Sequence, residues 1–177
     1  MATATFDNIV EDIISCTNEV FATMIPMEIT SDGSFHQKED MISTDVISLV
    51  SFTGEHSGII AFFGSKKMAM KITSNMLGIE VSSVDQDVKD AMGELTNMIG
   101  GTLKNKVFES FGAMHLSVPI VIAGVDLSIS SASNKNDKHN VSISPGVTCN
   151  SQNSWMMTPF SCEGDTFNMG LVVKKND

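Results

Sequence analysis

The sequence predicts a single α+β domain in which long helices pack on an antiparallel β-sheet. Two observations predict this class. Apolar residues recur at helical spacing in two long segments, and each segment is followed by a pair of apolar runs typical of a β-hairpin. The 177 residues match the size of one compact domain and can bury a core without disulfides or metals. We therefore expect one domain, residues 1–177.

The first helix and the first hairpin are expected in the N-terminal third. Residues 6–24 carry apolar side chains at helical spacing, with Thr5 as N-cap, and Pro26 stops the helix. The runs 46–52 and 59–63 are apolar and joined by a short loop flanked by glycines. They predict two paired strands.

Two further helices are expected in the middle of the chain. Ser65 and Gly78 have the residue types of an N-cap and a C-cap, and they bound a short helix. The longest helix is predicted over residues 84–111, where Ser83 and Gln86 have the spacing of a capping box.

Strands and loops are expected after this long helix. Residues 116–124 predict a strand that Pro119 places at a sheet edge or at its own start, with residues 125–130 as its partner. Residues 131–154 are rich in serine, asparagine and lysine and predict an exposed loop, with a short strand near 141–143.

The last hairpin echoes the first. It comprises residues 155–162 and 167–173, and its pattern of apolar residues and glycines resembles that of the first hairpin. Each hairpin also has a long helix upstream. The chain therefore has the pattern of a diverged duplication, a helix followed by strands, twice over.

Charge and targeting signals exclude several function classes. With 21 acidic and 11 basic residues, the net charge is −10 and the pI about 4.7, which disfavours binding to nucleic acid. No basic segment precedes an apolar run at the N-terminus, and no apolar run reaches the length of a membrane span. We expect a cytoplasmic protein without membrane insertion, with Cys16, Cys149 and Cys162 as buried, reduced thiols.

Common enzyme motifs are also missing from the sequence. The segment 54–58 reads Gly-Glu-His-Ser-Gly in a predicted turn, whereas a hydrolase nucleophile elbow needs Gly-x-Ser-x-Gly between a strand and a helix. The four histidines are dispersed, so no zinc site is predicted. No glycine-rich phosphate loop is present.

The long helix carries a polar stripe. At 100° per residue, Asp90, Glu94, Asn97 and Gly101 fall within about 60° of one another. The apolar positions lie opposite and are expected to pack on the sheet: Val84, Val88, Met92, Leu95, Ile99 and Leu103. The stripe therefore faces solvent or a partner, and its spacing alone fits an ordinary surface stripe as well.

Glycines lie beside the stripe at positions 93, 100 and 101. Each costs roughly 1 kcal/mol relative to alanine inside a helix. They favour the close approach of another backbone to this helix.

The pattern Asp90-x-x-x-Glu94-x-x-Asn97, followed by Pro119, resembles the signature of the chemotaxis phosphatase family that includes CheX, CheC and FliY. Further likeness lies in residues 57–63 with 76–78 and in residues 119–124. A single Glu–Asn helix is closer to CheX than to CheC. The resemblance implies a CheC-like two-layer fold with a pseudo-duplicated chain.

The resemblance also implies an activity, the dephosphorylation of a phosphorylated receiver domain of the CheY type. Asn97 would orient the attacking water, and Glu94 would pair with the active-site lysine of the receiver. Asp90, at the first motif position, would support the orientation of the helix or contact the partner. Gly101, on the same stripe, is expected to contact the partner. The Mg²⁺ would belong to the receiver, so no cofactor of this chain's own is expected. Homodimers joined through their sheets are implied as well.

The first predicted helix, residues 6–24, lacks the glutamate and asparagine pair of the motif. Aligning Val10 with Val88 places Cys16 at the position of Glu94 and Glu19 at the position of Asn97.

Two other functions stay open: a non-catalytic module that docks on or sequesters a signalling partner, and a domain for dimerisation or small-ligand sensing. The presence of both Glu94 and Asn97 favours the phosphatase, because a scaffold does not need the amide.

Overall fold

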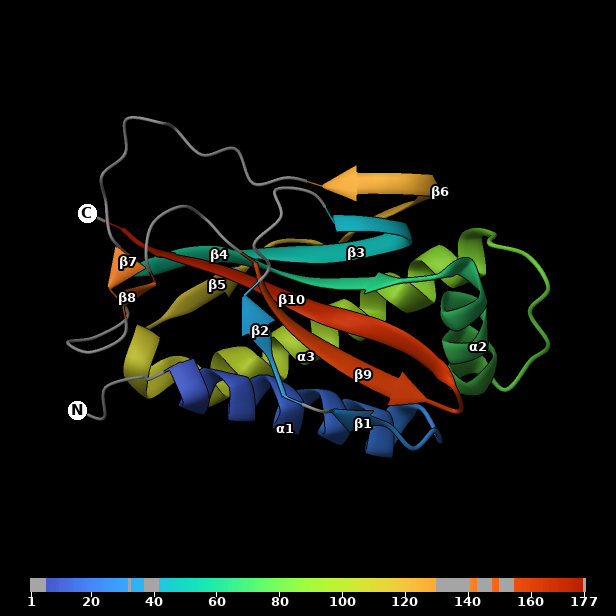
Figure 1. Ribbon diagram of the computed structural model, residues 1–177, viewed down its shortest axis with the longest axis horizontal. Helices are drawn as coiled ribbons and strands as arrows, with labels where there is room; N and C mark the ends of the chain where they lie inside the picture. Colours follow the sequence, from blue (N-terminus) through green and yellow to red (C-terminus); the bar gives the residue numbers. More distant parts are fainter. Residues whose placement is uncertain are drawn as a thin grey trace.

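The protein has two layers, a twisted sheet and a layer of helices along one of its faces (Figure 1). The computed structural model describes residues 6–31, 33–36, 42–129, 141–142, 148–149 and 155–176. The helices are α1 (Phe6–Met24), α2 (Lys66–Leu77) and α3 (Gln86–Phe111). Helices α1 and α3 lie side by side beneath the sheet, and α2 covers one end.

Eight of the described strands form one antiparallel sheet in the order β1-β9-β10-β4-β3-β5, with β2 on β9 and β6 on β3. Strands β7 and β8 pair separately. The strand bounds are β1 (Thr30–Ser31), β2 (Phe35–His36), β3 (Ile42–Gly54), β4 (His56–Gly64), β5 (Met114–Leu116), β6 (Ile120–Ile129), β7 (Val141–Ser142), β8 (Thr148–Cys149), β9 (Met156–Cys162) and β10 (Asp165–Lys175).

The two predicted hairpins meet at the centre of the sheet. Hairpin β3–β4 joins hairpin β9–β10 through β4 and β10, where Gly58 pairs with Val173 and Ala61 with Gly170. Each hairpin thus contributes its second strand to the centre and its first strand to the flank. This arrangement confirms the predicted α+β class with a pseudo-duplicated chain.

Several boundaries differ from those predicted. Helix α3 begins at Gln86, and its N-cap is Asp85, whose Oδ1 accepts a hydrogen bond from the Val88 amide at 3.3 Å. Ser83 is therefore not the cap, because the carboxylate two residues later takes that role. Residues 125–129 continue β6 along β3 and do not form a separate partner strand. The predicted N-cap Thr5, and most of the predicted loop 131–154, lie outside the described residues.

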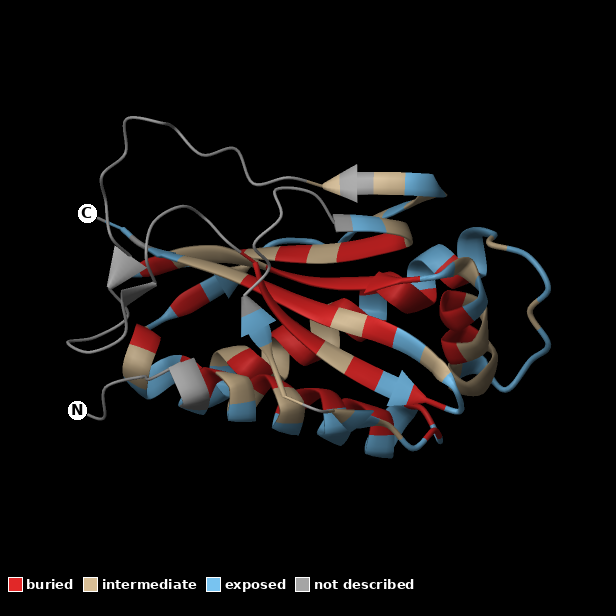
Figure 2. Cartoon of the chain, viewed as in Figure 1, coloured by how far each residue is buried: buried red, intermediate tan, exposed pale blue. Residues whose placement is uncertain are grey.

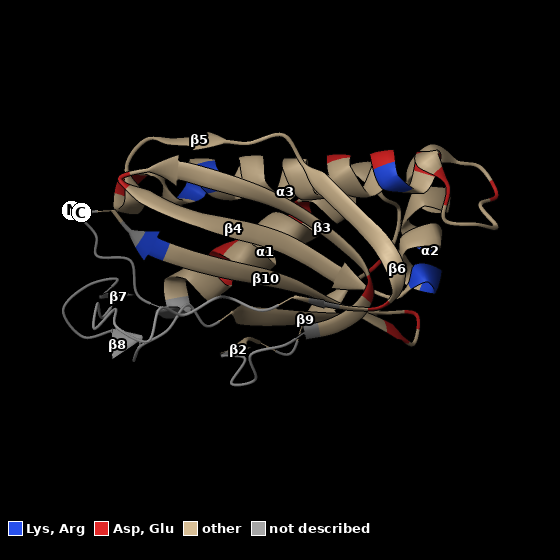
Figure 3. Cartoon of the chain, turned by 90° about the horizontal axis from the view of Figure 1, so that it is seen from above, with Lys and Arg blue, Asp and Glu red and all other residues tan. Residues whose placement is uncertain are grey.

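The main core lies between the helices and the sheet, where Figure 2 shows an almost continuous buried zone. At its centre the ring of Phe167 stacks on three others, with centroid distances of 5.4 Å to Phe21, 5.3 Å to Phe62 and 5.2 Å to Phe160. A smaller apolar cluster around Phe63 and Trp155 lies on the opposite sheet face. Figure 3 shows the charged residues of the described strands mainly at strand ends.

A buried hydrogen-bond group joins α3 to β3. The Ser48 hydroxyl donates to the Met92 carbonyl oxygen at 2.8 Å, and the Thr96 hydroxyl lies 2.8 Å from the Ser48 Oγ and 3.0 Å from the same carbonyl. Ser48 and Thr96 are both fully buried. These bonds fix the rotation of α3 relative to the sheet.

Replacing Thr96 by valine keeps the volume and removes its hydroxyl from this group. We expect the free energy of unfolding to fall by about 1 kcal/mol, because a buried hydrogen bond is lost, and Tm to fall by roughly 2–4 °C. Thermal denaturation of Thr96→Val, beside the exposed Thr166→Val as control, measures this. Equal stability of the two variants would show that the group contributes nothing.

Candidate functional site

The predicted stripe occupies the face of α3 that points away from the sheet. Glu94 and Asp90 are exposed, while Asn97 and Gly101 are half-buried. The opposite, apolar face is buried as predicted, with Val88, Met92, Leu95 and Ile99 fully covered. The sheet therefore holds α3 in the rotation that presents the four stripe residues outward.

Glu94 and Asn97 point outward without an intramolecular partner. Neither side chain makes a hydrogen bond or ion pair with any residue in the part of the chain that the structure describes. Asp90 differs, because its Oδ1 accepts a hydrogen bond from Gln86 Nε2 at 2.7 Å, one turn earlier. The carboxylate of Glu94 and the amide of Asn97 are thus available to a second molecule.

Gly93 and Gly100 meet side chains and not another backbone, which corrects the prediction of a close backbone approach. A Cβ on Gly93 would lie 3.5 Å from Pro119 Cγ and from Val121 Cγ2, and one on Gly100 would lie 3.3 Å from Ile60 Cγ2. Gly101 has open space around it. Pro119, directly before β6, therefore packs against α3 one residue before Glu94.

The open space at Gly101 belongs to a groove of about 460 Å³ that crosses the outer face of α3. One wall comes from α1, with Thr23 and Met24, and Leu116 of β5 lines it as well. Lys104 and Asn105 line the groove one turn after Gly101. The stripe is thus continuous with a surface depression between α1 and β5.

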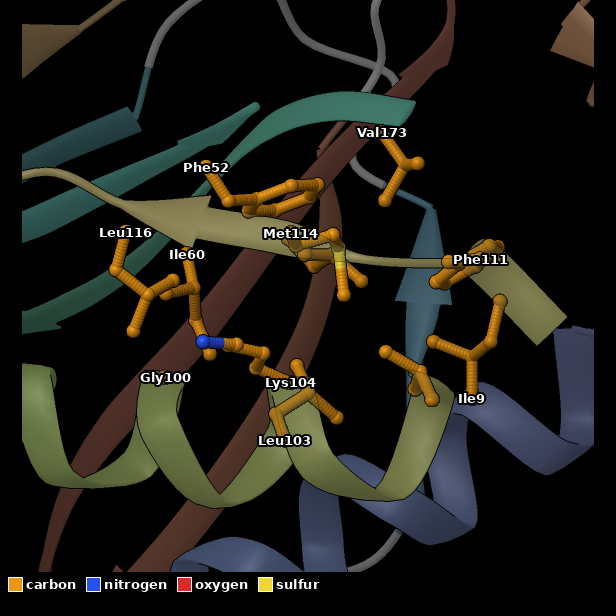
Figure 4. Close-up of a pocket in the computed structure, with 12 residues that line it drawn as sticks. Ile9, Phe52, Ile60, Gly100, Leu103, Lys104, Phe111, Met114, Leu116 and Val173 are labelled. Atoms are coloured by element: carbon orange, nitrogen blue, oxygen red, sulfur yellow. The ribbon is translucent and has the colours of Figure 1, made fainter. Parts of the chain in front are cut away.

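A second cavity lies beneath α3 and is apolar (Figure 4). Ile60, Leu103 and Met114 are among the residues that line it, and its volume is about 20 Å³. Such a volume holds about one water molecule, and a cavity with apolar walls stays dry. This cavity is too small for a metabolite.

Helix α1 presents a different chemistry at the duplicated positions. Cys16, at the position of Glu94, is fully buried, and burial raises the pKa of its thiol to about 12. Glu19, at the position of Asn97, lies with its carboxylate 3.8 Å from Lys106 Nζ. The α1 copy therefore cannot present an exposed carboxylate and amide as α3 does.

Across the described segments, no three His, Cys, Asp or Glu side chains are grouped as metal ligands. None of the helices in these segments is long and apolar enough to cross a membrane.

The sequence matches the family model described as "Chemotaxis phosphatase CheX" over residues 46–142, more than half of the chain. This range contains Glu94, Asn97 and Pro119. The chain belongs to the CheX family. The resemblance found in the sequence motif is thereby confirmed.

Individual CheX relatives agree with this assignment. The chain is 31% identical over 91 residues to the CheY-P phosphatase CheX of Thermotoga maritima, an alignment of 51% of this chain and 59% of that protein. The chain thus matches little more than half the length of that relative.

Solved CheX structures share the fold. A chemotaxis protein CheX from Desulfovibrio desulfuricans superposes with a TM-score of 0.77 at 24% identity, covering 94% of this chain and 99% of that one. The CheX–CheY–BeF3–Mg complex from Borrelia burgdorferi gives 0.66 at 16%, covering 95% and 99%. At these identities the likeness supports the CheC-like two-layer fold alone.

Lys104 and the groove are features of the site that the sequence analysis missed. The 100° rule places Lys104 about 20° from Asn97 around the helix, so helical arithmetic could have added it to the stripe. The groove has no sequence signal, because α1, α3 and β5 form it together.

The two adjacent glycines of α3 allow a matched test of the groove. Gly101→Ala adds a methyl group to open space and lowers the backbone entropy of the unfolded chain, so we expect about 0.5–1 kcal/mol of added stability. Gly100→Ala pushes on Ile60 and should gain clearly less. Thermal denaturation compares them, and destabilisation by Gly101→Ala would contradict an open groove.

Proposed function

We propose that this CheX-family protein is an aspartyl-phosphate phosphatase that acts on a phosphorylated CheY-type receiver domain. The observation that carries the proposal is the pair Glu94 and Asn97, one turn apart on the outer face of α3 and without partners among the described residues. The relative named CheY-P phosphatase and the fold likeness to a CheX bound to CheY support it.

In the proposed reaction, Asn97 holds the attacking water. The amide can accept a hydrogen bond from water and donate one, without any change of ionisation. The water oxygen attacks phosphorus in line with the aspartyl oxygen, the P–O bond to the aspartate breaks, and inorganic phosphate leaves. The protons of the water end on phosphate or solvent. Phosphoryl transfer depends mainly on such positioning, so an amide suffices.

Glu94 is proposed to set the docking register. Its carboxylate forms a charge-assisted pair with the active-site lysine of the receiver, which places Asn97 against the phosphoryl group. The receiver supplies the Mg²⁺. Asp90, held by Gln86, and Gly101, open to the groove, flank this pair on the contact surface.

The implied homodimer and the cytoplasmic location stay predictions. Strand β6 offers an edge for the dimer, because β3 is its only partner among the described strands. Exposed apolar side chains lie at or beside this strand, namely Val118, Ile120, Ile122 and Val125.

Removing either side chain of the pair should abolish most of the acceleration. For Asn97→Ala and for Glu94→Ala we expect the rate of phosphate release from a phosphorylated receiver to fall about 10²-fold, because one positioning group is lost in each. Release of inorganic phosphate in the presence of Mg²⁺ measures this. Glu109→Ala, which removes an exposed carboxylate further along α3, serves as control and should keep the wild-type rate.

Two outcomes would contradict the proposal. Full activity in Asn97→Ala would remove the amide from the mechanism. Tight binding of phosphorylated receivers without acceleration by the wild-type chain would show the sequestering module instead.

A further inference from the structure

We propose that Lys104 is a docking residue for the receiver, forming an intermolecular ion pair with a carboxylate beside the phosphorylated aspartate. The inference rests on the proposed function, because it concerns the partner of the same site. It adds a cation, at the groove, to a contact surface whose other charged groups are acidic.

Lys104 belongs to the functional face of α3. It follows Asn97 by seven residues, which places it about 10 Å further along the axis and about 20° around it. It is half-buried and lines the groove together with Gly101. Figure 4 shows its side chain extending back along α3 toward Gly100, on the side of Leu116. The Lys104 ammonium therefore lies closer to Asn97 along the helix axis than the Lys104 backbone does.

Lys104 has no ion-pair partner in the described part of the chain. Among the described residues, the ion pairs of Lys67, Lys71 and Lys106 are with Asp165, Glu163 and Glu19, whereas Lys104 has none. Glu19 lines the same groove, but its carboxylate lies 3.8 Å from Lys106 Nζ, which also donates to the Ser15 hydroxyl at 2.8 Å. An unpaired ammonium about two helical turns beyond Asn97 suits an acidic partner.

The receiver has the matching charge. A site that holds Mg²⁺ needs oxygen ligands, above all carboxylates, and the phosphoryl group adds further negative charge. A chain of net charge −10 repels such a surface as a whole. A cation of this chain at the contact would offset that repulsion locally, and all 11 basic residues of this chain are lysines. Lys104 is the lysine of α3 nearest the stripe. It lies about 20° from Asn97 around the helix, whereas Lys89 lies about 80° and Lys106 about 180° from Asn97.

Lys104→Met tests the ion pair, because methionine keeps an unbranched apolar stem against Leu116 and removes the charge. Lys89→Met makes the same change in net charge on the same helix, off the stripe. The probe is a CheY-type receiver loaded with beryllofluoride and Mg²⁺, titrated calorimetrically at low and at moderate salt. Phosphate release by the same proteins gives kcat and KM separately.

For Lys104→Met we expect Kd and KM to rise about two- to fivefold with kcat unchanged, because a partly exposed ion pair is lost. The salt dependence of Kd should also become weaker. Lys104→Glu should raise Kd about tenfold or more, since it places like charges together. Lys89→Met should stay within about 1.5-fold of wild type.

An unchanged Kd for Lys104→Met, an equal loss in Lys89→Met, or no binding by the wild-type chain would overturn the inference. Failure of the two proposals can be told apart. If Lys104→Met releases phosphate and binds the receiver with an unchanged Kd, only the docking role of Lys104 is rejected. If the wild-type chain releases no phosphate but Lys104→Met still raises Kd, the phosphatase activity is rejected and Lys104 stays a docking residue.

Discussion

The hydrogen bonds between Thr96, Ser48 and the Met92 carbonyl set the geometry on which the site depends. Thr96 lies between Glu94 and Asn97 in the sequence, and its hydroxyl is buried against β3. Because each residue turns the helix by about 100°, directing Thr96 inward sends Glu94 and Asn97 outward. The apolar side chains of Val88, Leu95 and Ile99 hold the same rotation by burial. The rest of the fold supports this helix: hairpins β3–β4 and β9–β10 build the sheet on which it packs, and α1 covers its flank.

This arrangement suits a site that is completed by a second protein. The packed helix keeps the backbone positions of the carboxylate and the amide at a fixed spacing, so docking costs side-chain entropy but little backbone entropy. The duplicated helix shows the contrast. At the position of Glu94 it carries Cys16, buried in the core with a strongly raised pKa, and that helix serves packing. At these matching positions α3 thus exposes a carboxylate, whereas α1 buries a thiol in the core.

Much of this was predictable from sequence, because strong apolar periodicity determines helices and hairpins locally. The α3 face and both hairpins were predicted correctly for that reason. The N-cap was not, since Ser83 and Asp85 are both favourable caps and tertiary packing decides between them. The prediction that residues 125–130 pair with residues 116–124 was wrong. Residues 125–129 belong to β6, and its pairing with β3 is a long-range contact. The role proposed for Lys104 needs the tertiary structure too, because only the packing of α1 on α3 shows that Glu19 pairs with Lys106.

The most direct test of the central claim is a crystal structure of this chain with a CheY-type receiver bearing beryllofluoride and Mg²⁺. The account predicts that the outer face of α3 enters the receiver's active site. The Asn97 amide should lie within hydrogen-bond distance of a water in line with the beryllofluoride, and the Glu94 carboxylate should contact the receiver's lysine. A complex in which α3 stays exposed to solvent, or in which Asn97 points away from the phosphoryl mimic, would contradict it.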